Sequence, residues 1–256
     1  MNQVAVAKSG RGGAVGVNRA VLWLARHWLA VFNILWGVFV ILPWLAPVMM
    51  RVGLTSPAKS VYFAYSFVCH QLPERSYFLF GSQPTYSLAQ INRVWPGNNP
   101  VTLRQFIGNA QFGYKVAWSD RMISMYGGIW LGALAFAWVR RRFKPISLWT
   151  YALCAAPMAI DGTTHLISDL WGIGQGFRDS NEWLAVLTNH ALPAWFYAGD
   201  ALGSFNSWMR LFTGLVFGLG TAALMLPYLE QSFAQIREEL ERRMSNDPLR
   251  MTRDED

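Results

Sequence analysis

The feature that most constrains this chain is a series of long apolar stretches without charged side chains. The first lies between Arg26 and Arg51 and is dense in Leu, Val, Ile, Phe and Trp across residues 28–50. A helix that crosses the hydrocarbon core of a bilayer needs about 20 such residues, because its backbone must satisfy its own hydrogen bonds there. We interpret residues 28–50 as a membrane span and not as a signal peptide, whose apolar region is shorter.

The other expected spans cover residues 122–139, 146–167 and 211–229. Composition agrees with this interpretation: 53% of the residues are hydrophobic and only 14% are charged, whereas soluble domains carry about 25% charged residues. The sequence therefore predicts an all-α integral membrane helix bundle with about four transmembrane helices.

Basic residues orient these spans. The amino-terminal arm, residues 1–27, carries basic but no acidic side chains, and the short connection at residues 140–144 reads Arg-Arg-Arg-Phe-Lys. Cytoplasmic loops carry an excess of Lys and Arg. We therefore expect a prokaryotic inner-membrane protein whose two termini are cytoplasmic, with outer segments at residues 51–121 and 168–209. The charged tail, residues 230–256, would extend the last span of the membrane domain into the cytoplasm as a helix.

Two shorter apolar stretches add one or two interfacial or re-entrant helices to this prediction. Residues 60–73 are too few to span a membrane and indicate a helix in the interface or tucked into the bundle. Residues 183–199 are apolar but contain Asn189, His190 and Pro193. A re-entrant or interfacial helix is the preferred interpretation of this second stretch, with a membrane span as the alternative.

Glycines on two of the expected spans predict close helix packing. Small residues three or four positions apart let membrane helices approach one another closely. Such spacings occur among Gly127, Gly128 and Gly132, and among Gly214, Gly218 and Gly220.

Ionisable residues fall at the outer ends of the expected spans. Asp161 and His165 are four positions apart and therefore share a helix face. An ionisable group inside a span costs at least ~2.5 kcal/mol and needs a partner or water, and Arg121 and Arg210 are the obvious partners for Asp161. Alternatively, arginines at span boundaries reach the lipid headgroups. The candidate polar site comprises Cys69, His70, Glu74, Arg75, Asp120, Arg121, Tyr126, Asp161, His165, Asn206 and Arg210.

Metal and cofactor binding find little support in the sequence. The adjacent pair Cys69 and His70 would need further ligands from His165, His190 or a carboxylate to complete a metal site. No phosphate-binding loop, dinucleotide fingerprint, zinc-protease motif or nucleophile elbow is present. The residues indicate no particular cofactor, and no folded basic module points to nucleic acid.

Four motifs, in order, resemble those of a prokaryotic membrane family known as domain of unknown function 2085. Residues 69–76 read Cys-His-Gln-Leu-Pro-Glu-Arg-Ser and resemble its first motif. Residues 119–128 keep the Arg, the Tyr and the last Gly of a second motif, Cys-x-Arg-Cys-x-Gly-x-Tyr-x-Gly. Residues 161–165 resemble Asp-Gly-x-x-Gln, with His in the last position. Residues 206–214 contain the Asn, Arg and Thr-Gly of the fourth.

The resemblance covers about residues 60–220 and implies a membrane fold without an established activity. Ser119 and Met122 stand where the family pattern has cysteines, which weakens a thiolate metal centre or a disulfide built with Cys69. The matching residues are mainly charged and hydrogen-bonding groups, and they favour a polar network or an anion site.

Several functions remain open from the sequence. The leading hypothesis is a polar Arg/Asp/His site at the extracytoplasmic end of the bundle that binds an anionic ligand, a lipid headgroup or a partner subunit. The alternatives are a membrane-embedded enzyme that uses His/Asp acid–base chemistry or a metal, and a small transporter. Besides the lipid bilayer, the expected partners are another membrane subunit or a second copy of the chain.

Overall fold

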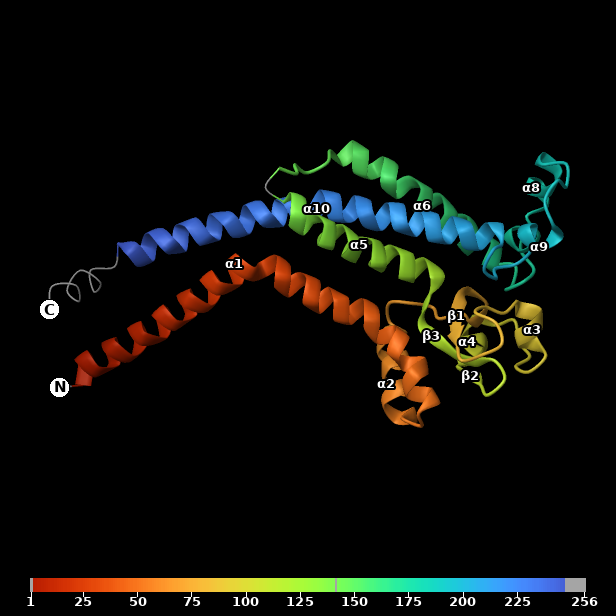
Figure 1. Cartoon of the computed structure of the whole chain (residues 1–256), viewed down its shortest axis with the longest axis horizontal. Helices are drawn as coiled ribbons and strands as arrows, with labels where there is room; N and C mark the ends of the chain where they lie inside the picture. Colours follow the sequence, from red (N-terminus) through yellow and green to blue (C-terminus); the bar gives the residue numbers. More distant parts are fainter. Residues whose placement is uncertain (1, 141, 247–256) are drawn as a thin grey trace.

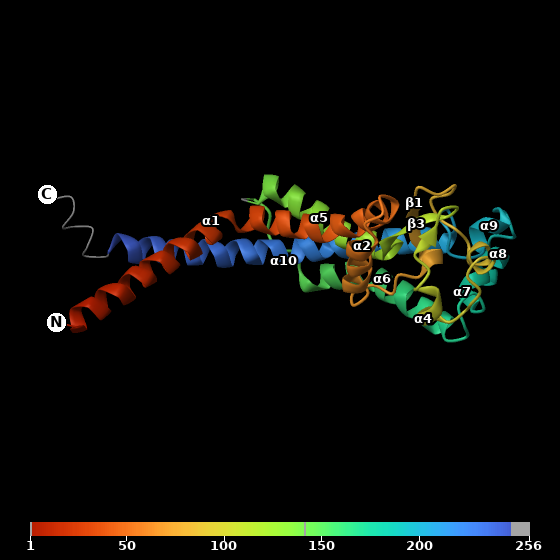
Figure 2. The ribbon, with the colours of Figure 1, turned by 90° about the horizontal axis from the view of Figure 1, so that it is seen from below.

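A computed structural model describes residues 2–140 and 142–246, with side chains from residue 16 onward. The described ends of the chain lie together at one end of an elongated molecule, and short elements form a compact cap at the other end (Figures 1 and 2). The side chains of Lys8 and Arg11, residue Arg141 and the acidic carboxyl terminus, which sequence analysis assigned to the cytoplasm, lie outside the described part.

Four long helices build the body of the molecule: α1 (Asn2–Arg51), α5 (Asp120–Val139), α6 (Leu148–Asp169) and α10 (Phe205–Ser245). Within the described residues, three helices are long and apolar enough to cross a membrane, namely α5, α10 and the part of α1 from Gly16. The chain is therefore a mostly helical membrane protein. The helix α6 has 22 residues but is not among these three, so a count of four spans remains a prediction.

Helices α5 and α10 make the most extensive helix–helix contact of the structure. Glycines face each other there, as the small-residue spacing predicts. A Cβ atom on Gly128 would lie 3.1 Å from the carbonyl oxygen of Leu215, and one on Gly218 would overlap the carbonyl oxygen of Met125. The backbones thus touch directly, which maximises van der Waals contact where no hydrophobic driving force acts between helices.

The cap begins with α2 (Thr55–Tyr65) and contains a small antiparallel sheet, so the all-α prediction is wrong in this respect. Its strands are β1 (Ser76–Leu79), β2 (Gly108–Asn109) and β3 (Gly113–Ser119), in the order β1-β3-β2. The strand β3 leads without a break into α5. The sheet therefore fixes where this helix begins.

Short helices complete the cap, and side chains cap the first turns of α3 and α4. The bounds are η1 (Pro73–Arg75), α3 (Leu88–Asn92), α4 (Pro100–Leu103), α7 (Phe177–Ser180), α8 (Glu182–Leu187) and α9 (Ala194–Tyr197). Ser87 and Gln90 form a reciprocal capping box at α3, and Asn99 accepts from the Val101 amide at α4. Such caps satisfy amides that a helix cannot pair internally.

Both interfacial helices expected from the sequence are shorter than predicted. Residues 60–73 form a helix only as far as Tyr65, and the chain then turns before η1. Residues 183–199 form the two short helices α8 and α9 instead of one. In both places the backbone has positive φ, at Gln71, Asn189 and His190, which a continuous right-handed helix does not tolerate.

Candidate functional site

Charged side chains from five parts of the chain converge where the cap meets the helices. They come from η1, the start of α5, the end of α6, the loop and short helix that follow it, and the approach to α10. The group, called the charged network below, comprises Arg75, Asp120, Arg121, Asp161, His165, Asp169, Arg178, Asp200 and Arg210. Its four arginines and four aspartates cancel in formal charge.

Arg210 is the most completely paired member. Its Nε and Nη2 atoms donate to the two carboxylate oxygens of Asp120 at 2.8 Å each. Its Nη1 donates to the Asp200 carboxylate, and its Nη2 also donates to the Asp200 carbonyl oxygen at 2.7 Å. Only 1% of Arg210 is exposed. The expectation that Arg210 pairs with Asp161 is wrong, because Asp120 on the facing helix α5 occupies its guanidinium.

Arg75 joins the cap to the same group. Its Nη1 and Nη2 atoms donate to the two carboxylate oxygens of Asp169 at 2.8 Å, and its Nε donates to Asp200 at 2.8 Å. Burial would raise the pKa of Asp200, but the guanidinium groups of Arg75 and Arg210 hold that pKa well below its ordinary value. Asp200 is therefore an anion that two cations share.

Asp161 is shared by two other arginines. Its Oδ2 accepts from Arg121 Nη2 and its Oδ1 from Arg178 Nη2, both at 2.7 Å. The Arg121 contact agrees with the sequence expectation. A Cβ atom on Gly162 would lie 2.9 Å from Arg121 Nη1, so glycine at this position makes room for the guanidinium. Arg178 also lies over the ring of Phe205, 5.5 Å from its centroid.

Charge is distributed unevenly in the charged network. Arg121 and Arg178 have one carboxylate between them, and the Nε atom of each is buried without a hydrogen-bond partner. Arg75 and Arg210, in contrast, contact three carboxylates, those of Asp120, Asp169 and Asp200. The Asp161 side of the network thus carries one excess positive charge, and the Asp200 side one excess negative charge.

His165 lies between the two sides. Its Nδ1 is 2.9 Å from the Asp161 carbonyl oxygen, and its Nε2 is 3.4 Å from Arg210 Nη1. The same Nδ1 is 3.4 Å from Arg121 Nη2, so the ring contacts one guanidinium on each side of the charged network. With 3% of the residue exposed, the imidazole acts here as a spacer between arginines.

Two asparagines hold the loop that carries Arg178. Asn206 donates through Nδ2 to the Arg178 carbonyl at 2.7 Å and the Gly199 carbonyl at 3.0 Å. Asn181, whose φ of 45° lies in the left-handed region, donates to the carbonyls of Arg178 and Tyr197. Asn206 is therefore a positioning residue for Arg178.

Four predicted site residues, Cys69, His70, Glu74 and Tyr126, make no hydrogen bond to the charged network. Buried Cys69 accepts from the Ser119 amide at 3.3 Å, and Tyr126 packs in an aromatic cluster with Phe39 and Trp118. His70 is exposed, and its Nδ1 accepts from the Leu72 amide at 3.1 Å. Among the described residues, no three His, Cys, Asp or Glu side chains are grouped to hold a metal ion.

Glu74 and Lys115 are buried beside the charged network. Only 2% of Glu74 is exposed, and neither carboxylate oxygen has a hydrogen-bond partner. Burial raises the pKa of Glu74 to about 7, against the opposing effect of Arg75. Lys115 donates to the carbonyls of Gln71 and Arg104, and burial lowers its pKa to about 7.

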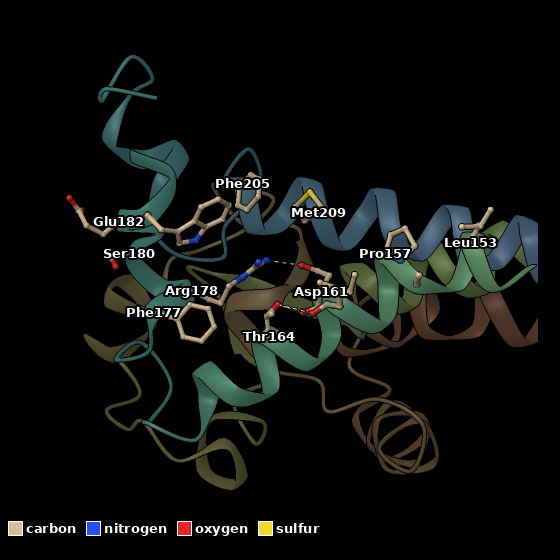
Figure 3. A pocket seen from close by; sticks show the side chains of 13 residues that line it. Leu153, Pro157, Asp161, Thr164, Phe177, Arg178, Ser180, Glu182, Phe205 and Met209 are labelled. Atoms are coloured by element: carbon tan, nitrogen blue, oxygen red, sulfur yellow. Dashed lines mark hydrogen bonds and ion pairs between the residues drawn. The ribbon is translucent and has the colours of Figure 1, made fainter. Parts of the chain in front are cut away.

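A cavity of about 880 Å³ lies next to Arg178, between α6, the start of α10 and the segment from α7 to α8. Figure 3 shows the Arg178 guanidinium pointing from α7 toward Asp161, with Leu153 and Pro157 on one side and Ser180 and Glu182 on the other. Apolar side chains form most of its lining, among them Pro157, Ile160 and Phe205. A smaller cavity of about 340 Å³ is lined by Arg121 on another face of α6.

Sequence reasoning did not include Asp169, Arg178, Lys115 and Asp200 in the candidate site. Asp200 is visible in the sequence as an acid just before the last span, and could have been added on that ground. The others lie at a helix end, in a short helix or in a strand, where no periodic pattern marks them.

Comparison with known proteins agrees with the membrane assignment. Residues 110–224 match the family described as predicted membrane protein (DUF2085), which confirms the resemblance seen in the motifs. An uncharacterized protein of Methanocaldococcus jannaschii is 27% identical over 158 residues, which are 59% of this chain and 76% of that protein. No solved structure matches.

Proposed function

We propose that this chain is a four-span inner-membrane protein that binds an anionic group at the outer end of its helix bundle. The observation that carries the proposal is the pair Arg121 and Arg178, which share the single carboxylate of Asp161 and keep buried, unpaired Nε atoms. A guanidinium carries five N–H donors and matches the oxygens of phosphate and carboxylate groups. An anion at these arginines would balance the excess charge on this side of the charged network.

The fourth span of the proposal is α6. Its 22 residues correspond to about 33 Å of helix, enough for a hydrocarbon core of about 30 Å. Large apolar side chains on it, such as Leu153 and Ile160, are 75% and 65% exposed, as suits contact with lipid. With four spans, both chain ends lie on the same side, and the basic connection at residues 140–144 places that side in the cytoplasm.

Cysteine labelling tests this orientation. In a chain with Cys69→Ser and Cys154→Ser, we expect Val101→Cys in the cap to react with a membrane-impermeant thiol reagent in intact bacterial cells. Ser232→Cys, exposed on the tail part of α10, should react only after permeabilisation. Val101 is 62% exposed, so burial does not limit its reaction. Labelling of Ser232→Cys in intact cells, with Val101→Cys protected, would overturn the orientation.

Anion binding is tested with inorganic phosphate as the probe. For protein purified in a neutral detergent, phosphate should raise the melting temperature above that in chloride at equal ionic strength, because a ligand that binds only the folded state stabilises it. Each kcal/mol of added stability raises the melting temperature by about 2–4 °C for a chain of this size. Arg121→Gln and Arg178→Gln should each reduce this rise, and Asp161 keeps one arginine partner in either variant.

The matched control is Arg93→Gln, which removes an exposed arginine of the cap outside the charged network. Its response to phosphate should equal that of the unmodified chain. An equal response in Arg178→Gln, or no response in the unmodified chain, would refute the proposed anion site.

A further inference from the structure

The 880 Å³ cavity combines an apolar wall with a charged end. Leu153 and Ile160 contribute to its wall, and Arg178, Asp161 and Glu182 supply its charges. The Glu182 side chain is 69% exposed and points away from Arg178 (Figure 3). Its volume falls in the range of about 300–1,000 Å³ that is typical of sites for small organic ligands. Such a lining matches a ligand that is mostly apolar and carries one polar group.

The cavity extends along the membrane-facing helix α6. Leu153 precedes Asp161 by about two helical turns, which corresponds to about 12 Å along the axis. Leu153 and Ile160 are also largely exposed, so the apolar wall continues into the outer surface of α6. A ligand in this cavity would therefore have its apolar part where the hydrocarbon of the bilayer begins.

The charged end of the cavity indicates the sign of the ligand's charge. Arg178 is 8% exposed, and its Nε has no hydrogen-bond partner although the atom is buried. Its position is fixed by Asp161, by the ring of Phe205 and by Asn206, which binds its carbonyl. A buried cation that shares its counter-ion with Arg121 favours an anionic group and disfavours a cationic one.

We propose that the cavity binds an anionic lipid, with its headgroup at Arg178 and a hydrocarbon chain along α6 from Ile160 toward Leu153. This inference rests on the proposed anion site and names its class of ligand. The bilayer supplies such molecules at high local concentration, and an acyl chain that moves from bilayer hydrocarbon to this wall only exchanges one apolar environment for another, at little cost. The charge of Arg178 and the apolar shape of the cavity therefore both favour an anionic lipid.

Fluorescence quenching of Trp183 provides the test, because this side chain lines the cavity. The full chain is reconstituted in vesicles of phosphatidylcholine that contain phosphatidate with a brominated acyl chain. The Trp183 signal is the difference between each protein and its Trp183→Phe counterpart. We expect brominated phosphatidate to quench this signal at a lower mole fraction than brominated phosphatidylcholine does.

Two variants separate the contribution of the lipid headgroup from that of its acyl chain. Arg178→Gln should weaken the preference for phosphatidate about tenfold, as the loss of a charge-assisted hydrogen bond implies. Ala156→Phe should fill the cavity and abolish selective quenching, whereas the response of melting temperature to inorganic phosphate should persist. The control Ala152→Phe places the same side chain at an exposed position of α6 outside the cavity lining and should leave quenching unchanged.

The outcomes distinguish this inference from the proposed function. Stabilisation by phosphate without any preference for brominated phosphatidate would overturn the lipid ligand and leave the anion site standing. Equal quenching by both lipids in every variant, together with no phosphate response, would overturn both proposals. Selective quenching that Ala156→Phe abolishes and Ala152→Phe preserves would support the lipid site.

Discussion

Replacing Arg210 with alanine is expected to lower the free energy of unfolding by about 3–5 kcal/mol, the usual cost of breaking a buried ion pair by removing one partner. The change leaves Asp120 and Asp200 buried, with Asp120 losing its three hydrogen bonds to the guanidinium. Thermal unfolding of the purified protein in detergent measures the effect. Arg210→Lys should recover only part of the loss, because an ammonium group cannot reproduce the fork to Asp120.

The control for the Arg210→Ala variant is Arg243→Ala, on the same helix α10. The side chain of Arg243 is 69% exposed and pairs with Glu239 one turn away. Exposed pairs of this kind contribute about 0.3–0.5 kcal/mol. A loss in Arg210→Ala no larger than in Arg243→Ala would mean that the charged network does not hold the cap to the helices.

Glu74 is expected to give the second large effect, a dependence of the free energy of unfolding on pH. The unfolded chain releases this proton near pH 4.5, whereas the folded chain retains it to about pH 7. At this residue the folded state therefore binds more protons in this interval, and the contribution of Glu74 to the free energy of unfolding falls as pH rises from about 5 to 7. The shift corresponds to a loss on the order of 3 kcal/mol. Glu74→Gln should remove most of this slope.

Lys115 changes the free energy of unfolding in the opposite direction at higher pH. Its pKa is lowered from 10.5 to about 7, so the folded chain releases its proton first and the free energy of unfolding rises with pH above about 7. His70, whose pKa is lowered from 6.5 to about 3 by desolvation of its ring and by Arg75 nearby, makes the free energy of unfolding rise over pH 5–7. The contribution of Glu74 is therefore the difference in slope between the unmodified chain and Glu74→Gln. Glu238→Gln, an exposed change in the tail part of α10, is the control and should keep the original slope. A slope that Glu74→Gln leaves intact would contradict the assignment.

The helices were easier to predict from the sequence than the cap. Charged residues bracket the second and fourth expected spans, and α5 and α10 indeed cover residues 122–139 and 211–229. The sheet was missed because β2 has only two residues, and because β3 is buried at nearly every position. A strand buried on both faces does not alternate between polar and apolar residues, and so it gives no signal of period two.

The charged network was only partly predictable for a similar reason. Asp161 and Arg121 lie on neighbouring expected spans at equal depth, which was enough to pair them. Arg178 lies in the four-residue helix α7, and its contact with Asp161 depends on a loop that Asn181 and Asn206 hold in place. Local sequence patterns do not reveal the geometry of such a loop. They also do not show that Arg210 pairs with Asp120 and not with Asp161.

The glycine contact between α5 and α10 restricts how the molecule can rearrange. A Cβ atom at Gly218 would overlap the backbone of α5, so the two helices approach this closely only where glycine is present. The helix α6 has less extensive contacts with α10 and carries Asp161. Displacement of α6 would separate Asp161 from Arg121 and leave the contact between α5 and α10 intact. The shared carboxylate of Asp161 thus lies on a helix that packs less extensively against α10 than α5 does.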